Sequence, residues 1–163
     1  MKNNRIIFLK AGSEYLTDCS KILENTTLGQ KYFLDSTGEY IGKKLLEEGF
    51  EKEEIYISFD KNNKNQIIGF SWIQARGIFN WFPYLHVVAI AKENQGKGYG
   101  KKHMAHFESM CQEVFKASKG FLVVGKYNTK AIELYKKIGY QMVGSLPNLF
   151  VNGLDELFMY KEM

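Results

Sequence analysis

The residues with the clearest chemical potential form a glycine-rich segment in the middle of the chain. Gly96, Gly98 and Gly100 alternate after an apolar run and before an amphipathic pattern. Glycine admits positive φ values and lets a ligand approach the backbone without obstruction by a side chain. Backbone N–H groups at a helix start favour an anion, and lysines between and after the glycines add positive charge. The segment therefore predicts a site for a phosphate or a pyrophosphate.

Three kinds of nucleotide loop have to be distinguished here. A Walker loop needs Gly-Lys-Ser/Thr, but Lys101 and Lys102 follow Gly100, so no hydroxyl is available for magnesium. The dinucleotide fingerprint G-x-G-x-x-G needs a glycine where Lys101 stands. The pattern Gln/Arg-x-x-Gly-x-Gly/Ala is satisfied by Gln95, Gly98 and Gly100. A glycine loop that serves only as a helix entry remains the alternative.

A second segment adds to this pattern. The run from Asn128 to Tyr140 has the form N-x-x-A-x-x-L-Y-x-K-x-G-Y and follows the apolar run Phe121–Val124. Together the two segments resemble the GCN5-related N-acetyltransferase superfamily, whose members bind acetyl-CoA. The resemblance is specific from Leu85 to Tyr140. Lys92 stands where many members have proline, which affects the stiffness of the loop more than its chemistry.

The resemblance implies acetyl-CoA as co-substrate and names the backbone that holds it. The pyrophosphate would lie on the loop residues Gln95, Gly96, Lys97, Gly98, Tyr99, Gly100 and Lys101. The preceding strand is expected to bulge and to leave backbone groups of Val87, Val88 and Ile90 for the pantetheine, which pairs like an added strand. Asn128 matches an asparagine that hydrogen-bonds the pantetheine arm.

The resemblance also implies two catalytic side chains. Tyr135 matches a tyrosine beside the thioester sulfur. Because a phenol has a pKa of about 10 and a thiol about 8.5, full proton transfer is uphill by roughly 2 kcal/mol, so a hydrogen bond to the thiolate is expected. His86 stands where arylalkylamine members carry a histidine, and an imidazole suits proton abstraction from an amine. The alternatives are a core tyrosine satisfied by a backbone carbonyl and a core histidine.

The periodicity of the chain predicts the elements that position these residues. Strands are expected at Arg5–Lys10, Glu54–Phe59, Gln66–Gln74, Trp81–Ala91, Phe121–Val124, Gln141–Val151 and Leu154–Lys161, and helices at Ser13–Gly29, Tyr32–Phe50, Tyr99–Ala117 and Thr129–Ile138. Asn152-Gly153 is expected to form a hairpin turn. The order is β-α-α-β-β-β-α-β-α-β-β. It predicts an α/β fold with a mixed, mostly antiparallel sheet flanked by helices, in one domain over residues 1–163.

Composition and charge exclude several classes of protein. The chain has 163 residues, 45% hydrophobic and 25% charged, which excludes a disordered chain. No apolar run reaches the roughly 20 residues of a membrane span, and Met1–Gly12 lacks a signal-peptide core. Two cysteines are expected to be reduced thiols in a cytoplasmic protein. No Cys/His cluster has the spacing of metal ligands, so no metal is expected.

The net charge of +4 is unevenly distributed. Lys92–Lys137 carries +6 and Glu39–Asp60 carries −4, the pattern expected where one side meets an anion and the other a cation. Two solvated helix faces would give the same pattern. The sequence has only two arginines and no basic block interleaved with aromatic residues, which argues against nucleic acid as a partner.

These observations predict an acetyl-CoA-dependent N-acetyltransferase. A primary amine of a small molecule or peptide would attack the thioester directly in a ternary complex, while a backbone N–H around Val88 polarises the carbonyl. The acceptor is expected near Leu28–Gly49, Gly77–Trp81 and Leu146–Gly153, and its identity stays open. Two alternatives remain, a non-catalytic acyl-CoA-binding or regulatory domain of the same fold and a nucleotide-phosphate binder. A homodimer also stays open.

Overall fold

The computed structural model describes residues 6–163, apart from the side chains at 64 and 65, and divides the chain into two compact units. The first unit comprises the chain up to Ile73 together with Val87–Met104. The second comprises Gln74–His86 and Ala105–Met163. The hydrogen-bonded strand order is β1-β2-β3-β4-β5-β7-β6.

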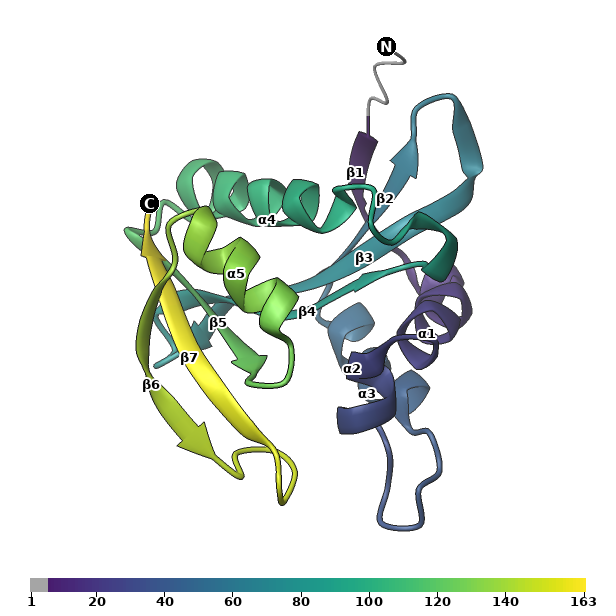
Figure 1. Cartoon of the computed structure of the whole chain (residues 1–163). Helices are drawn as coiled ribbons and strands as arrows, with labels where there is room; N and C mark the ends of the chain where they lie inside the picture. The colour runs from purple at the N-terminus through teal and green to yellow at the C-terminus, as the bar shows by residue number, and fades with distance from the viewer. Residues whose placement is uncertain (1–5) are drawn as a thin grey trace. The chain divides into compact units, whose positions relative to one another are not determined.

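The secondary-structure elements follow one another along the chain as coloured in Figure 1. The strands are β1 (Ile6–Lys10), β2 (Ile55–Asp60), β3 (Asn63–Ile78), β4 (Phe82–Ile90), β5 (Lys119–Gly125), β6 (Gln141–Pro147) and β7 (Asp155–Glu162). The α-helices are α1 (Leu16–Glu24), α2 (Thr27–Tyr32), α3 (Gly42–Glu51), α4 (Tyr99–Ser109) and α5 (Thr129–Lys137). Short 3-10 turns cover Ser13–Tyr15 and Lys92–Asn94, and α4 continues as a π-helical turn at Met110–Val114.

The core of the first unit lies between its helices and one face of its strands. Strand β2 pairs antiparallel with β1 and with β3. Because side chains alternate along a strand, Ile55, Ile57 and Phe59 point to the same face, and all three are buried. They belong to one apolar cluster with residues of α1 and α3 such as Leu23 and Leu46. This packing explains the helical spacing of apolar residues before β2.

A polar contact fastens the start of α4 to the opposite face of the same strands. His103 is fully buried, and both of its ring nitrogens are hydrogen-bonded. Nε2 lies 2.9 Å from the Ser58 hydroxyl of β2, and Nδ1 lies 2.6 Å from the Ser71 hydroxyl of β3. Buried polar groups are stable when they are paired in this way. The N-terminal half of α4, which follows the glycine segment, is thereby anchored to β2 and β3.

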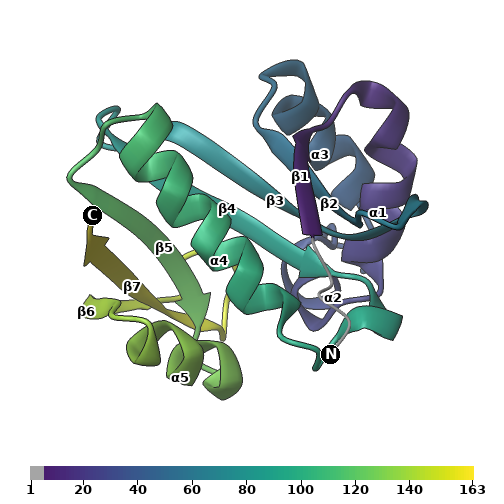
Figure 2. The same ribbon diagram turned by 90° about the horizontal axis from the view of Figure 1, so that it is seen from above.

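The second unit contains β5, β6 and β7 with the first residues of β4. Strand β7 pairs antiparallel with β5 and β6, whereas β4 and β5 pair in parallel through Tyr84 with Phe121 and Leu85 with Leu122. In Figure 2, β5 and β7 lie beside each other, as they do in Figure 1. One face of these strands is aromatic, because Phe121 stacks on Phe158 with ring centroids 5.4 Å apart.

The predicted fold class is confirmed, and the largest difference lies between β1 and β2. Three α-helices connect these strands rather than two, since α3 begins only at Gly42. Asp35 accepts hydrogen bonds from the backbone N–H groups of Thr37 and Glu39, and Gly38 has a φ of +86°. These interactions close a turn that competes with a helix. The N-terminal strand begins at Ile6 among the described residues, and Arg5 lies outside them.

Other boundaries shift for local reasons. Asn152 and Gly153 do form a turn, closed by the Leu154 N–H donating to the Val151 carbonyl oxygen at 3.1 Å. The predicted two-residue hairpin is wrong, because β6 ends at Pro147 and a longer connection leads to β7. Cys19 and Cys111 are free and buried, and burial raises the pKa of each thiol to about 12.

Within residues 6–163, no helix combines the length and the apolar character that crossing a membrane requires. The single domain, the absence of a metal and the cytoplasmic location stay predictions.

Candidate functional site

The glycine segment forms an open loop between β4 and α4 in the first unit. Gly96 and Gly98 have φ values of +74° and +81°, which L side chains rarely adopt. Gly100 has an ordinary φ and stands in the first turn of α4. A Cβ atom built on any of these three glycines would have no heavy atom within 4 Å. The loop therefore presents bare backbone to open space, as a phosphate-binding loop requires.

The hydrogen bonds within the loop leave backbone N–H groups in the first turn of α4 without a partner inside the helix. The Gln95 side chain donates from Nε2 to the Ile90 carbonyl oxygen at 3.0 Å, so it ties the loop to the end of β4. The backbone N–H of Lys102 donates to the Gly98 carbonyl oxygen at 3.4 Å and begins the helical ladder. The N–H groups of the preceding residues have no partner within the helix by its geometry. Gln95 thus shapes the loop through its side chain, while the first turn of α4 offers its N–H groups.

The charges around the loop favour an anion. Lys97 and Lys101 are exposed, and neither takes part in an ion pair found among residues 6–163. The Lys102 ammonium lies 5.6 Å from the centroid of the Tyr99 ring, whose side chain is buried. The positive end of the α4 dipole adds to these charges. The loop can hold a diphosphate without a metal ligand from the protein.

The residues expected to contact pantetheine lie in the last part of β4. Val87 is buried, whereas Val88 and Ile90 are half-buried. The register pairs of β4 with β5 are confined to Tyr84 and Leu85 in the part of the chain that the structure describes. The ladder between these strands therefore ends before Val87. The bulge and the pantetheine contacts themselves stay predictions.

Asn128 stands at the N-terminus of α5 in the second unit. Its Oδ1 accepts a hydrogen bond from the Ala131 N–H at 3.2 Å, so the side chain caps the helix. The cap uses the carbonyl oxygen, and the side-chain amide still has its N–H donors. A structural role is therefore established for Asn128, and a hydrogen bond to pantetheine remains compatible with it.

Tyr135 lies in the last turn of α5. Its side chain is half-buried, and its ring centroid is 5.9 Å from that of Tyr140. Burial raises the pKa of Tyr135 to about 12. Its hydroxyl makes no hydrogen bond with any residue in 6–163, so no backbone carbonyl satisfies it there. The hydroxyl can therefore donate to a ligand, and the raised pKa keeps its proton in place.

His86 lines a pocket of about 400 Å³ in the second unit. The ring of Tyr84, on the same face of β4, lies edge-on to the imidazole with centroids 5.5 Å apart. Val123 of β5 and Phe158 of β7 belong to the same lining. Burial raises the pKa of Tyr84 to about 12, so its phenol stays neutral. The pocket thus combines one imidazole with apolar and aromatic walls.

The turn between β3 and β4 supplies one edge of this pocket. Phe79 and Asn80 have φ values of 55° and 54°, and the Trp81 N–H donates to the Ile78 carbonyl oxygen at 3.0 Å. These are features of a type I′ turn, in which Asn and Gly are favoured and Phe is unusual. The side chain of Phe79 is 82% exposed and lines the pocket.

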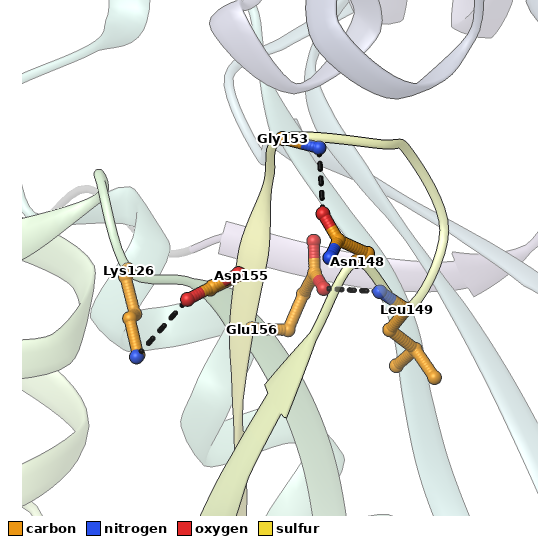
Figure 3. Close-up of polar contacts among 6 residues, drawn as sticks. All are labelled: Lys126, Asn148, Leu149, Gly153, Asp155 and Glu156. Atoms are coloured by element: carbon orange, nitrogen blue, oxygen red, sulfur yellow. Dashed lines mark hydrogen bonds and ion pairs between the residues drawn. The ribbon is translucent and has the colours of Figure 1, made fainter.

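The connection between β6 and β7 supplies the other edge, and Figure 3 shows how it is held. The buried carboxylate of Glu156 accepts a hydrogen bond from the Leu149 N–H at 3.2 Å. Asn148 Oδ1 accepts from the Gly153 N–H at 2.7 Å. Leu149 and Phe150 line the pocket although they are 42% and 58% exposed. The loop therefore presents apolar side chains toward the imidazole.

Residues that are far apart in the sequence line one pocket in the structure. It places His86 with parts of the predicted acceptor regions Gly77–Trp81 and Leu146–Gly153. The sequence did not single out Phe79, Leu149, Phe150 or Glu156. A Phe-Asn pair between two strand-like runs carries no ordinary signal for a tight turn. Trp81, considered earlier for the acceptor site, lines a different pocket with Arg76.

Comparison with known proteins identifies the class to which the fold and the loop belong. The model of the acetyltransferase (GNAT) family matches residues 21–140. The chain belongs to this family. A probable spermine N(1)-acetyltransferase from Bacillus subtilis subsp. natto (strain BEST195) is 31% identical over 115 residues, which cover 71% of this chain and 62% of that protein. The match thus spans less than two thirds of the relative's length.

Solved structures share the fold at low sequence identity. A spermidine N-acetyltransferase from Vibrio cholerae in complex with CoA and spermine has a TM-score of 0.74, with 19% identity over 98% of this chain and 96% of that chain. A GNAT-family acetyltransferase from Bacillus cereus ATCC 10987 has a TM-score of 0.72, with 16% identity over 97% of each chain. At these identities the likeness establishes the fold alone.

Proposed function

We propose that this chain transfers an acetyl group from acetyl-CoA to a primary amine. The observation that carries the proposal is the open glycine loop at the start of α4, where Gly96 and Gly98 have positive φ and added Cβ atoms would meet nothing. Membership in the acetyltransferase (GNAT) family supports the same reading. Acetyl-CoA supplies the activated acyl group as a thioester, and the protein binds and orients it.

The proposed cofactor contacts come from the glycine loop, from the end of β4 and from the start of α5. The N–H groups from Gly96 to Lys101 bind the diphosphate, and the lysines around them balance its charge. The backbone N–H of Gln95, which the sequence also suggested, donates instead to the Lys92 carbonyl oxygen at 3.3 Å. Backbone groups of Val87, Val88 and Ile90 hydrogen-bond the pantetheine, and the Asn128 amide donates to it as well. The N–H around Val88 polarises the thioester carbonyl. None of these contacts requires a side-chain nucleophile.

In the transfer step the amine nitrogen forms a bond to the acetyl carbon, and the bond from that carbon to sulfur breaks. His86 accepts the amine proton directly or through water, because an alkylammonium cannot attack a carbonyl. Tyr135 donates a hydrogen bond to the departing thiolate. With a pKa of about 12 against about 8.5 for a thiol, full transfer of its proton is uphill by about 5 kcal/mol. Tyr135 therefore stabilises the thiolate, and solvent completes the protonation.

Thiol-release kinetics with acetyl-CoA and a panel of amines test this function. The panel should include polyamines, alkylamines, amino acids, aminoglycosides and peptide N-termini. We expect amine-dependent release of CoA with at least one of these classes, and mass spectrometry should find the acetylated amine. CoA binding without transfer to any amine would favour the non-catalytic acyl-CoA-binding alternative. Stabilisation by ATP with magnesium, and none by CoA, would favour the nucleotide binder.

The finer assignments are proposals of the same kind. The curated relative is described as a probable spermine N(1)-acetyltransferase, which supports a small-molecule amine as acceptor. A peptide amine remains the second candidate. The cytoplasmic location, a homodimer, and the absence of nucleic-acid and membrane partners also stay predictions.

A further inference from the structure

We propose that the acceptor is a primary amine attached to an apolar group, and that the pocket beside His86 discriminates against polyamines. This inference rests on the proposed function, since it assigns the substrate class of the same site. It differs from the polyamine named for the curated relative.

The walls of the pocket match an apolar group. Val123, Leu146 and Phe158 contribute to them, and the volume of about 400 Å³ lies in the range of small-molecule sites. His86 is the titratable group suited to meet the amine, with the phenol of Tyr84 beside it. Among the described residues that line this pocket, none carries a carboxylate. A second ammonium of a polyamine would therefore lose water without gaining a counter-ion, which is unfavourable.

The mouth of the pocket exposes apolar side chains to solvent, which is unfavourable in the absence of a ligand. Phe79 is 82% exposed and has a φ of 55°, a conformation that is unfavourable for a residue other than glycine, asparagine or aspartate. Leu149 and Phe150 stand exposed on the other side of the same pocket. Exposed apolar clusters of this kind mark binding surfaces. A strained aromatic residue at the mouth is consistent with contact to an apolar ligand.

The carboxylate of Glu156 is hydrogen-bonded to the connection between β6 and β7. Glu156 is only 1% exposed and accepts a hydrogen bond from the Leu149 N–H, as Figure 3 shows. Its carboxylate holds the backbone of Leu149, and it does not belong to the side chains that line the pocket. The pocket therefore remains apolar apart from its imidazole, phenol and amide groups.

A matched pair of amines tests the proposal. Hexylamine and 1,6-diaminohexane share a six-carbon chain and differ in a second ammonium group. We expect kcat/KM for hexylamine to exceed that for 1,6-diaminohexane, and that for spermidine, at least tenfold. Equal or reversed values would overturn the assignment of the acceptor class and leave the acetyltransferase function intact. Calorimetry of both amines with CoA-bound protein should give the same ranking.

The binding measurement separates the two proposals. If hexylamine binds more tightly than the two polyamines but is not acetylated, the preference of the pocket for an apolar amine stands and the proposed acetyl transfer fails. If neither amine binds and spermidine does, the acceptor class is wrong. If no amine binds at all, the acceptor class is also wrong. Each result thus decides one proposal without the other.

Two variants locate the selectivity. Phe79→Asn should raise KM for hexylamine about fivefold while the melting temperature stays equal or rises, because Asn tolerates the turn conformation. Leu149→Asp should reduce the preference for hexylamine over 1,6-diaminohexane, since it adds a carboxylate at the rim. Val143→Asn, an exposed apolar position outside the pocket, serves as the matched control and should change neither value. Unchanged kinetics in both rim variants would overturn the assignment to this pocket.

Discussion

The glycine loop and the pocket beside His86 differ in how they can recognise a molecule. The loop offers backbone N–H groups from consecutive residues, and its glycines leave the space above them empty. The pocket is assembled from residues of β3, β4, β5, β6 and β7 and from two connections far apart in the chain. Backbone recognition demands particular residues at fixed spacing, whereas an apolar wall accepts many side chains of similar volume. We therefore expect substitutions in the two regions to change different kinetic constants.

The largest effect is expected in the pocket, at its imidazole. His86→Gln should lower kcat/KM for the amine about 100-fold at neutral pH, because the positioned base is lost. The deficit should shrink at higher pH, where more of the amine is already deprotonated. KM for acetyl-CoA should stay within twofold of its value in the unmodified protein. A pH–rate curve identical to that of the unmodified protein would remove His86 from the mechanism.

Tyr135 should show the next largest effect. Tyr135→Phe removes the hydroxyl and keeps the ring that packs near Tyr140. Turnover should fall about 10- to 100-fold, since a hydrogen bond to the charged thiolate is worth roughly 1.5–3 kcal/mol. The dissociation constant of CoA, measured by calorimetry, should change less than twofold. An unchanged turnover would discard the proposed hydrogen bond to sulfur.

The glycine loop should respond in affinity rather than in turnover. Gly100→Ala places a methyl group into empty space at an ordinary φ, so folding should be unaffected. The added methyl blocks the approach of a diphosphate, and we expect the affinity for CoA to fall about tenfold, which is about 1.4 kcal/mol. Gly144→Ala is the matched control, because that position in β6 is equally open. If both variants bind CoA alike, the diphosphate does not lie on Gly100.

The smallest expected effect is on the pH dependence of stability, in which two histidines of α4 should differ. His103 in the first unit has both ring nitrogens bonded to serines, whereas burial lowers the pKa of His106 in the second unit to about 4. An unfolded histidine has a pKa of about 6.5, so the unfolded state binds the extra proton between these values. Stability is fully present above pH 6.5 and is lost as the pH falls toward 4.

The measurement for this effect is thermal unfolding at pH 7 and pH 4.5. The free energy of unfolding should fall by about 2 kcal/mol through His106 over this range. His106→Gln should remove that part of the loss, while the His86→Gln variant keeps it. An equal acid loss in the His106→Gln variant would assign the acid sensitivity to other groups.

The sequence predicts the region from β4 to α5 better than the rest of the chain. The glycine loop and the capped helix with Asn128 and Tyr135 are contiguous segments whose residue types follow from local geometry. The helix predicted over residues 33–41 is absent, because the hydrogen bonds of Asp35 close a turn there that overrides the helical spacing. Two regions of the pocket, Gly77–Trp81 and Leu146–Gly153, were expected near the acceptor, but their meeting with His86 could not be predicted, since it depends on the pairing of β4, β5, β6 and β7. A substrate recognised by packed side chains leaves little trace in a single sequence.

Calorimetric titration with CoA and with pantetheine tests the central claim most directly. Both ligands carry the thiol and the pantetheine arm, but only CoA carries the diphosphate. If the loop at Gly96 and Gly98 binds that diphosphate, CoA should bind at least 100-fold more tightly than pantetheine, and added salt should weaken CoA binding. Equal affinities for the two ligands, or no binding of CoA, would contradict the account.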